Sequence, residues 1–461
     1  MNSLFNRSFK VLFLFFLLTG YSCSSDDGYS TIPDEKPDIK PEDKLPVVTI
    51  NTNGGVIVDE PKIKAKMDIF IVHTPEYQGN IGIEIRGASS QMFPKKSYGL
   101  ETRDANDEDL EVSIFGFPEE EDWILYAPYS DKSLMRNFLI YDLSRDMDRY
   151  ASRCKFVDLE INGEYKGVYV FMEKLKRDKG RIDINKLKKD ENSGEDLTGG
   201  YILKIDKISG NNLGDGYNDQ NSFTSKYKPL HSSNGQEIRY LYDYPKAEKI
   251  TTQQKDYIKE YVNNFEDALA SDDFTDPEKG YRAYIDVDSF IDFFLLNEVS
   301  HNVDGFRLST YMHKDKNGKL KMGPIWDFNL AFGNANYCGG GDTDSWAYQF
   351  NSRCPNDFWA VPFWWERFLQ DPEFVSRLKA RWAELRGNVL SDASILNKID
   401  DYETLLNKSG SVDENFKVWQ ILGVYVWPNN YVGKTYQEEL NYLQEWIKSR
   451  LTWMDRAVNN L

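Results

Sequence analysis

Short runs of hydrophobic and polar residues with strand-like patterns recur through the first half of the chain. The first is Leu45 to Ile50, which an Asn-Gly-Gly turn follows. Five more runs predict strands at Lys66 to His73, Ile81 to Arg86, Ser97 to Glu101, Phe156 to Ile161 and Gly167 to Glu173. The last two flank an Asn-Gly-Glu turn, which is typical of a hairpin. We therefore expect the first half to be rich in strands.

Hydrophobic residues at helical spacing become dominant in the second half. One earlier helix is predicted at Ser133 to Asp148, where Leu134, Phe138 and Tyr141 recur at this spacing. Further helices are predicted at Thr252 to Ser271, at Val287 to Ser300, and from Pro372 onward, ending in Gln437 to Leu461. Polar, Gly- and Asn-rich stretches predict surface loops at Lys188 to Gly200 and Ser209 to Gly235. The order predicts an α+β protein, with a strand-rich N-terminal half and a helical C-terminal half. It is compatible with a two-lobed body whose cleft holds a ligand.

Two acidic segments lie close together late in the chain, joined by a predicted hairpin. Asn302 to Arg307 contains Asp304, and Gly323 to Asn329 contains Asp327. Between them we expect a strand, an Asn-Gly turn and a second strand, so that the chain returns to its starting point. Both carboxylates should then face one pocket. The alternative is that Asp304 caps a turn and Asp327 is a turn residue at a strand end, without a chemical role.

A candidate phosphate-binding segment lies upstream. The strand ending at Arg86 is followed by the small residues Gly87 to Ser90, and the chain then returns with the paired Lys95 and Lys96. Backbone N–H groups in such a turn, with a cation behind them, can hold a phosphate. The pattern differs from the phosphate-binding P-loop, and a solvated hairpin is the alternative interpretation.

The balance of charge excludes one class of function. The formal net charge is -18, from 74 acidic and 56 basic residues, whereas a general nucleic-acid-binding protein needs a basic face. Aromatic residues make up 14% of the chain, so most of it is expected to fold. The spacing of the four Cys and four His does not fit a zinc site. A bound metal is therefore expected to be a hard cation on oxygen ligands.

The N-terminus predicts export. An apolar run from Val11 to Leu18 follows basic residues and is too short to span a bilayer. Residues 1–22 resemble a lipoprotein signal peptide that leaves Cys23 as the lipidated N-terminus, and Ser24 to Asp27 resembles an export signal of surface lipoproteins. We expect a lipoprotein of the outer membrane or cell surface, attached to the membrane by its lipid anchor only. Residues 23–44 would be a flexible tether and residues 45–461 the folded domain. The alternative is a soluble secreted protein with a coincidental Cys23.

Three further cysteines remain once Cys23 is set aside. Cys338 and Cys354 are near in sequence and flank a Gly-rich loop, and an oxidising exterior permits a disulfide. We expect these two to pair. Cys154 is then expected to be a buried free thiol.

Several motifs follow one another in an order that carries a resemblance to a known family. They are Ile85 to Ser90 with Pro94 to Tyr98, Asp122 to Asn137, Ile161 to Tyr169, Met172 to Lys174, Asn302 to Arg307, and Gly323 to Gly333. In this order they resemble the CotH (spore coat protein H) kinases, a family of atypical protein kinases. The resemblance spans about Leu45 to Leu461.

The resemblance implies a two-lobed, protein-kinase-like fold that binds ATP with magnesium or manganese. It implies phosphorylation of protein hydroxyl groups, on another protein or on the chain itself. By match to the motifs, Asp304 would be the catalytic acid/base and Asp327 a metal ligand, with Asn329 as a second candidate ligand. The implied contacts to the nucleotide phosphates are Lys95 or Lys96, Arg86 and Lys174, with Glu173 as the acidic partner of a lysine. Asp131 has two open interpretations, a functional residue or the cap of the following helix.

Two positions depart from the expected pattern. Kinases place an Asn five residues after the catalytic Asp to hold a second metal ion, and this chain has Ser309 there. The family tends to stack an aromatic residue on adenine at the position that matches Lys321. Both departures affect the implied contacts to the metal and the nucleotide.

Other classes of function compete with an active kinase. The chain can be a catalytically inactive, pseudokinase-like binding protein of the cell surface, or an adhesin. Trp359, Phe363, Trp364 and Trp365 would then form a platform for protein or glycan, whereas the alternative for these residues is core packing. The acidic loop Asp342 to Asp344 suggests a further alternative, a calcium-stabilised adhesin, although the loop lacks the full ligand spacing of an EF-hand.

Overall fold

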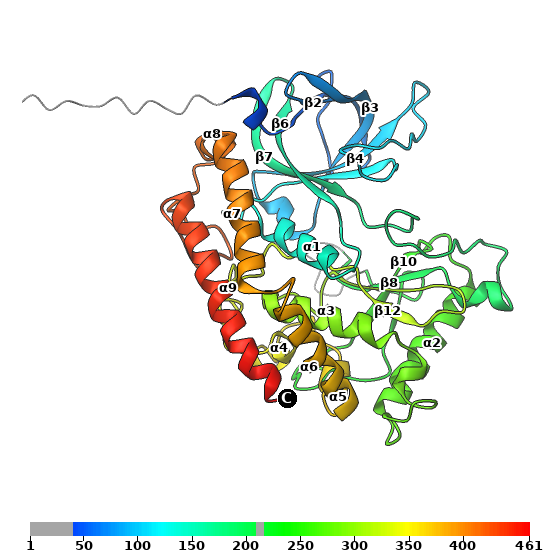
Figure 1. Ribbon diagram of the computed structural model, residues 1–461. Helices are drawn as coiled ribbons and strands as arrows, with labels where there is room; N and C mark the ends of the chain where they lie inside the picture. Colours follow the sequence, from blue (N-terminus) through cyan, green and yellow to red (C-terminus); the bar gives the residue numbers. More distant parts are fainter. Residues whose placement is uncertain (1–39, 209–215) are drawn as a thin grey trace, which may run out of the picture. The chain divides into compact units, whose positions relative to one another are not determined.

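The structure, a computed structural model, describes residues 40–208 and 216–461 (Figure 1). The expected signal peptide, Cys23 and most of the expected tether lie outside the described residues. The expected α+β class is confirmed, with a strand-rich N-terminal half and a helical C-terminal half. Within the described residues, no helix combines the length and the apolar character that crossing a membrane requires.

Seven strands of the first half close into a barrel in the order β1-β2-β3-β4-β5-β7-β6. Their bounds are β1 Val47–Asn51, β2 Ile63–Ile71, β3 Thr74–Arg86, β4 Ser97–Arg103, β5 Asp122–Tyr126, β6 Cys154–Ile161 and β7 Glu164–Glu173. Neighbouring strands are antiparallel except β1 and β6, which pair in parallel. Alternate side chains such as Met67 and Ile83 are fully buried inside. This interior fixes the register of β3, which ends at Arg86.

Two barrel strands differ from the sequence prediction. β3 begins at Thr74 rather than at Ile81, because its first half is mostly polar and is held by backbone pairing with β2. β5 was not predicted as a strand, although Trp123 on it is fully buried and stacks on Phe171, with ring centroids 5.3 Å apart. Both strands depend on neighbours that are distant in sequence, and a local pattern does not reveal such neighbours.

A second sheet of five strands has the order β12-β11-β8-β10-β9. Its strands are β8 Tyr201–Ile205, β9 Ser222–Thr224, β10 Arg239–Tyr244, β11 Thr310–Lys314 and β12 Leu320–Met322. β11 and β12 form the expected hairpin, in which Met312 pairs with Met322. β9 lies within the stretch predicted as a surface loop, so that part of the prediction was wrong. Three residues are too few to show a strand period.

The α-helices lie mainly in the second half of the described chain. Their bounds are α1 Arg136–Asp146, α2 Thr252–Ala270, α3 Val287–Ser300, α4 Phe350–Arg353, α5 Trp364–Phe368, α6 Pro372–Arg386, α7 Asp392–Lys408, α8 Ser411–Val418 and α9 Tyr436–Asn459. Short 3-10 helices lie at Pro41–Asp43, Ser89–Met92, Glu195–Thr198, Tyr281–Ala283 and Ala347–Gln349. The expected α3 is confirmed, and the Asp286 side chain caps it by accepting a hydrogen bond from the Ser289 N–H at 3.0 Å.

The buried α3 helix connects the second sheet to the C-terminal helices. All of its residues except Asp288 are buried, and it packs against β12, α6 and α9. In Figure 1 the long α9 runs beside α7, while α8 lies next to β7 of the barrel. α3 thus leads from the protein core directly into the segment that contains Asp304.

Candidate active site

The β11–β12 hairpin brings Asp304 and Asp327 to the same end of the second sheet. Asp304 precedes β11 and Asp327 follows β12, so antiparallel pairing returns the chain beside its start. The Phe332 N–H donates to the Ser300 carbonyl at 2.7 Å, which ties the segment after Asp327 to the end of α3. The two carboxylates are close enough for the charge of Asp304 to raise the pKa of Asp327.

Asp327 is exposed as a residue, although protein groups crowd its carboxyl group. The loss of surrounding water raises its pKa to about 6, and repulsion from Asp304 and Asp206 adds to this effect, against smaller opposing contributions from Lys207 and Arg86. Among the described residues no donor is hydrogen-bonded to this carboxylate. It therefore has free lone pairs in a negatively charged environment.

Helix α1 holds the backbone of the Asp327 loop. The Asp327 N–H donates to the Tyr141 hydroxyl at 3.0 Å, and the Phe328 N–H donates to the Asn137 side chain at 2.7 Å. Asp327 has φ +63°, in the left-handed region that Asp adopts more readily than most residues. These contacts give the upstream motif around Asn137 a positioning role.

Asp304 is held differently, through its side chain. Its Oδ1 accepts hydrogen bonds from Arg307 Nη2 at 2.8 Å and from the Tyr337 hydroxyl at 3.2 Å. Its side chain is 23% exposed. Among the described residues its Oδ2 has no donor, so one oxygen remains available to a ligand.

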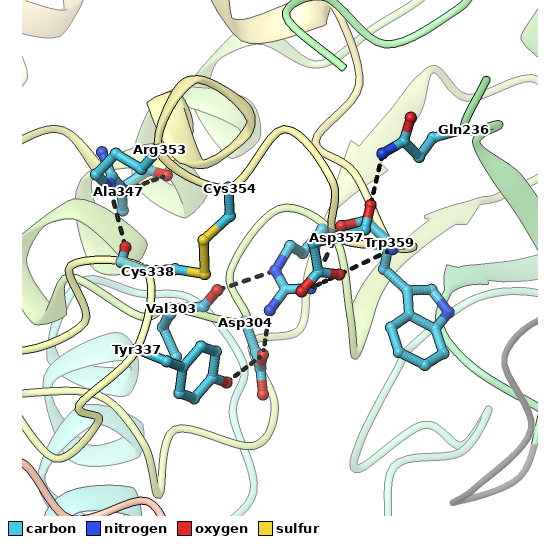
Figure 2. The surroundings of a disulfide bond; sticks show 11 residues. Gln236, Val303, Asp304, Tyr337, Cys338, Ala347, Arg353, Cys354, Asp357 and Trp359 are labelled. Atoms are coloured by element: carbon cyan, nitrogen blue, oxygen red, sulfur yellow. Dashed lines mark hydrogen bonds and ion pairs between the residues drawn. A yellow bond between two sulfur atoms is a disulfide. The ribbon is translucent and has the colours of Figure 1, made fainter. Parts of the chain in front are cut away.

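A disulfide stabilises the surroundings of Asp304. Cys338 and Cys354 are bonded, with 5.7 Å between their Cα atoms, and Cys154 is a buried free thiol. Tyr337 directly precedes Cys338, and the segment after Cys354 supplies Asp357, whose carboxylate accepts from Arg307 Nη1 at 3.2 Å. Figure 2 shows Tyr337, Asp357 and the disulfide around Asp304. The disulfide thus links the two segments that position this carboxylate.

Arg307 connects these segments from a buried position. Its side chain is 2% exposed, donates to the Val303 carbonyl at 3.0 Å and lies 3.8 Å from the centroid of the Phe350 ring. On the solvent side, Tyr337 stacks with Trp427, which is 46% exposed, at a centroid distance of 6.3 Å.

Asp206 is a third carboxylate at the site, and sequence reasoning missed it. It directly follows β8, which pairs with β11, so it lies beside the start of β11. It accepts from the Lys207 N–H at 2.9 Å and from the backbone of Ser309, while burial raises its pKa. The signal was an Ile-Asp-Lys sequence after a short apolar run, which becomes informative once β8 is known to be a strand.

Two cations lie near the three carboxylates. Arg86, at the end of β3, lies 5.8 Å from the centroid of the Trp326 ring and interacts electrostatically with Asp327. Lys207 lowers the pKa of Asp327, and its Nζ donates to the Ser89 hydroxyl at 2.7 Å. Lys207 thereby connects the turn of small residues, a candidate phosphate-binding segment, with the end of β8. It was also missed from the sequence.

The paired lysines do not join this group. Lys96 Nζ donates to the Gln91 carbonyl at 2.5 Å, within its own turn. Lys95 is 2% exposed and donates to the Val168 carbonyl at 2.6 Å and to the Asn415 side chain at 2.8 Å. Burial lowers the pKa of Lys95 to about 7. Lys95 therefore lies at the contact of the barrel with α8, because these buried acceptors bind its ammonium group.

Glu173 and Lys174 also lie in a separate network. The Glu173 carboxylate is buried and accepts from Arg153 Nη1 at 2.7 Å, so its partner is an arginine rather than a lysine. Lys174 Nζ lies 3.1 Å from Asp122. These contacts lie where β7 ends and β5 begins, and the structure does not bring either residue to the Asp304–Asp327 pair.

Asp131 holds the start of α1 from outside the helix, whose N-cap residue is Met135. Its carboxylate is fully buried and accepts from the Ser133 N–H at 3.2 Å and from the Arg136 N–H at 2.9 Å, at the start of α1. This explains why α1 begins at Arg136 rather than at Ser133. Of the two open interpretations, these contacts favour a structural role at the start of the helix, although Asp131 is not its N-cap residue.

A cavity of about 220 Å³ lies next to the Asp327 loop. Gly323, Pro324 and Ile325 form one wall, and Ile325 is two residues from Asp327. The other lining residues are Ser144, Asp148, Arg149, Tyr150, Arg181, Ile182, Asp183, Ser289, Phe293, Leu296, His313, Lys321 and Met322. Lys321 is half exposed, 4.0 Å from Asp286. The cavity thus combines apolar walls with several charged groups.

The residues that suggested the competing functions, a binding platform and a calcium site, lie outside the candidate active site. Trp364 and Trp365 are buried in the main core, so the core interpretation holds for them. In the described ranges, the acidic groups that lie close enough to share one ion are Glu120, Glu121 and Asp122, and Lys176 is ion-paired with all three at 2.5–3.0 Å. The loop from Asp342 to Asp344 is not part of such a group.

Comparison with models of known protein families gives a match. A family model described as "CotH kinase protein" matches residues 83–454, which includes both acidic loops and the barrel strands from β4 onward. A search of curated proteins finds no match.

Proposed function

The chain belongs to the CotH kinase family, and from this premise we propose that it transfers the terminal phosphate of a nucleoside triphosphate to a protein hydroxyl. The resemblance implies ATP as the donor. The observation that carries the proposal is the convergence of Asp304, Asp327 and Asp206 at one sheet end, beside the cations Arg86 and Lys207. Phosphoryl transfer depends chiefly on such positioned charges. The barrel and the helical part would act as the two lobes around the nucleotide.

In this proposal Asp304 accepts the proton of the attacking hydroxyl. Oδ1 is fixed by Arg307 and Tyr337, and this leaves Oδ2 to receive the proton. A fixed orientation favours proton transfer because the acceptor lone pair must point at the hydroxyl in the reactive geometry.

Asp327 and Asn329 would hold the divalent cation. Asp327 fits this role because it is exposed as a residue, and because its carboxylate lacks a hydrogen-bonded donor among the described residues and has a pKa raised in part by neighbouring carboxylates. A bound magnesium or manganese ion would neutralise charge on the phosphates. Arg86, Lys207 and the N–H groups of Gly87 to Ser90 would orient the phosphates.

We further propose that the protein acts at the cell surface or outer membrane. The lipoprotein-like signal and Cys23 support this location. The partner would be a protein substrate, including another copy of the same chain, and no nucleic acid. The disulfide beside Asp304 agrees with an oxidising environment.

Transfer of radiolabelled phosphate by the purified chain tests the proposal. With magnesium and nucleoside triphosphate, wild type should label a protein acceptor, and Asp304→Asn and Asp327→Asn should reduce labelling by at least about 100-fold. Asp344→Asn is the matched control, an exposed carboxylate outside the cluster. Labelling that is absent in wild type, or equal in all four proteins, would contradict a kinase. Nucleotide binding without transfer would support the pseudokinase-like binding protein instead.

A further inference from the structure

The aromatic side chains that reach the surface gather around Asp304. In the described parts of the chain, the strongly exposed ones are Phe358 at 40%, Tyr425 at 52% and Trp427 at 46%. The other aromatic rings of these parts are buried or half-buried. Single exposed hydrophobic residues are ordinary, whereas a group of them in one place marks an interaction site.

Tyr337 joins two of these exposed rings to Asp304. Its hydroxyl donates to Asp304 Oδ1 at 3.2 Å, and its ring stacks on that of Trp427, with the planes 4° apart and the centroids 6.3 Å apart. The preceding residue, Asn336, donates from Nδ2 to the Tyr425 hydroxyl at 3.0 Å. Tyr425 and Trp427 are thus attached to a segment that orients the candidate acid/base.

Phe358 belongs to another segment that surrounds Asp304. It directly precedes Trp359, whose carbonyl accepts from Arg307 Nη1 at 3.3 Å, and the two rings meet edge to face with centroids 5.3 Å apart. In Figure 2, Tyr337 and Trp359 lie on opposite sides of Asp304. Exposed rings therefore belong to the segments on both sides of the carboxylate.

The surface around Trp427 favours an apolar side chain over a charged one. Val424, which is 50% exposed, extends the surface of Tyr425 and Trp427, and we call these three residues the exposed patch. Aromatic rings alone also attract cations. An aliphatic side chain does not compensate a cation for the water that it loses on contact. A large apolar side chain, however, gains free energy by burial against all three residues.

Acidic side chains are disfavoured at the same place. Gly341 packs directly against the Asn430 side chain, which brings the exposed Asp342 next to the loop that carries the exposed patch. Lys132, which donates to the carbonyl of the patch residue Val424, is fully buried. The carboxylates of Asp342 and Asp304 therefore repel an acidic segment that approaches the patch.

We propose that the exposed patch and Phe358 bind the acceptor segment of the protein substrate. They select a segment with a large apolar side chain near the acceptor hydroxyl and without acidic side chains there. The inference rests on the proposed function, which puts this hydroxyl at Asp304 Oδ2. An extended chain advances roughly 3.3 Å per residue, so a side chain roughly two to four residues from the hydroxyl reaches the patch. Exposed Trp and Tyr residues often dominate the energy of such contacts.

An array of immobilised peptides tests the inference with the purified full-length chain. Each peptide carries one Ser in a neutral sequence of Gly and Ala, with a single Leu, Arg or Glu at one of about four positions on either side. With magnesium and nucleoside triphosphate, wild type should label the best Leu peptide about tenfold more than the all-Ala peptide. Arg and Glu peptides should not exceed the all-Ala peptide. Binding of the chain to the same array is measured without nucleotide.

Substitutions in the patch give the second part of the test. Trp427→Ala should bring the ratio of Leu to all-Ala labelling close to one. Val424→Ser keeps the ring stack on Tyr337 and should lower the ratio about threefold. The ratio cancels any loss of kcat that both peptides share. Leu405→Ala is the matched control, an exposed apolar residue of α7 outside the patch, and its ratio should equal that of wild type.

Each outcome has one meaning. Equal labelling of Leu and all-Ala peptides by wild type overturns the inference while the kinase proposal stands. A preference for Arg peptides also overturns it, as does an unchanged ratio in a folded Trp427→Ala or Val424→Ser protein. If wild type binds Leu peptides preferentially and Val424→Ser weakens this preference, but no phosphate is transferred, the inference stands and the kinase proposal fails. An array that is neither bound nor labelled contradicts both.

Discussion

The two carboxylates of the candidate site are held in opposite ways. The side chain of Asp304 is fixed by Arg307 and Tyr337, and a disulfide links the segment of Tyr337 to that of Asp357, the second partner of Arg307. For Asp327 the backbone is fixed by α1, while its carboxylate has no donor among the described residues. A proton acceptor needs one orientation, whereas a metal ligand must adjust to the ion that it binds. The contrast therefore assigns different chemistry to two residues of the same type.

Replacement of Arg307 should have the largest effect, because its buried guanidinium fixes the Asp304 side chain. In Arg307→Met, Asp304 loses its main partner and Asp357 loses its ion pair. We expect kcat to fall by about 100-fold with a smaller change in metal affinity, because the carboxylate is misoriented. The free energy of unfolding should fall by roughly 2–4 kcal/mol, since both acidic partners are partly exposed.

Kinetics and urea unfolding measure these two effects. Arg377→Met is the control, because Arg377 pairs with the exposed Asp288 and should contribute less than about 1 kcal/mol. A kcat equal to that of wild type in a folded Arg307→Met protein would show that Asp304 does not need the hydrogen bond from Arg307 for catalysis.

Acidification should weaken metal binding through Asp327, the carboxylate with the raised pKa. Since its pKa is raised to about 6, protonation competes with the metal, and metal affinity should fall about tenfold for each pH unit below 6. The effect of acidification on folding stability is opposite to its effect on metal affinity, because the folded-state pKa of Asp327 lies above the unfolded value of 3.8. The contribution of this group to stability is present below about pH 4 and is lost as pH rises through 6.

Metal titrations by calorimetry between about pH 5 and pH 7 check this dependence. Asp327→Asn should remove it, together with most of the affinity. Metal affinity that stays constant over this range in wild type would mean that another group is the main ligand.

Loss of the support beneath Asp327 should have an intermediate effect. Asn137→Ala leaves the buried Phe328 N–H without its acceptor. We expect about fivefold weaker metal binding, from a loss of roughly 1 kcal/mol in loop positioning, and little change in kcat at saturating metal. A fall in kcat with unchanged metal affinity would reverse the roles assigned to the two loops.

Removal of one hydrogen bond to Asp304 should have the smallest effect. Tyr337→Phe keeps the ring stacked on Trp427 and leaves Arg307 in place. We expect kcat to fall about threefold, in line with a neutral hydrogen bond worth roughly 0.5–1 kcal/mol, with metal affinity unchanged. The comparison with Arg307→Met then measures how much each of the two donors, Arg307 and Tyr337, contributes to the orientation of Asp304.

Local patterns predicted the elements around the site better than the contacts within it. The Asn-Gly turn between two short strands was sufficient to predict that Asp304 and Asp327 face one place, because antiparallel pairing is a local consequence of such a turn. The helix that Asp131 holds at its start and that carries Asn137 was also predicted, although its role in holding the Asp327 loop was not.

The remaining contacts depend on partners that are far apart in sequence. Asp206 and Lys207 join the site only because β8 pairs with β11, more than a hundred residues later. Lys95 matched the expected phosphate-binding residue by its motif, but its partner is the side chain of Asn415, 320 positions away. Burial by a distant helix leaves no local signal in the sequence.

The bond between Lys95 and Asn415 also has a consequence for synthesis of the protein. The barrel sequence leaves the ribosome long before residue 415 has been made, and until then Lys95 has no side-chain acceptor on α8. Its ammonium group then has only the Val168 carbonyl as an acceptor, and the face of β7 that α8 covers stays open. A chain truncated after β7 would therefore expose this face of β7 and lack the acceptor of Lys95 on α8. The barrel closes through its own seven strands, and α8 then covers β7 from outside, so a C-terminal segment completes the packing around Lys95.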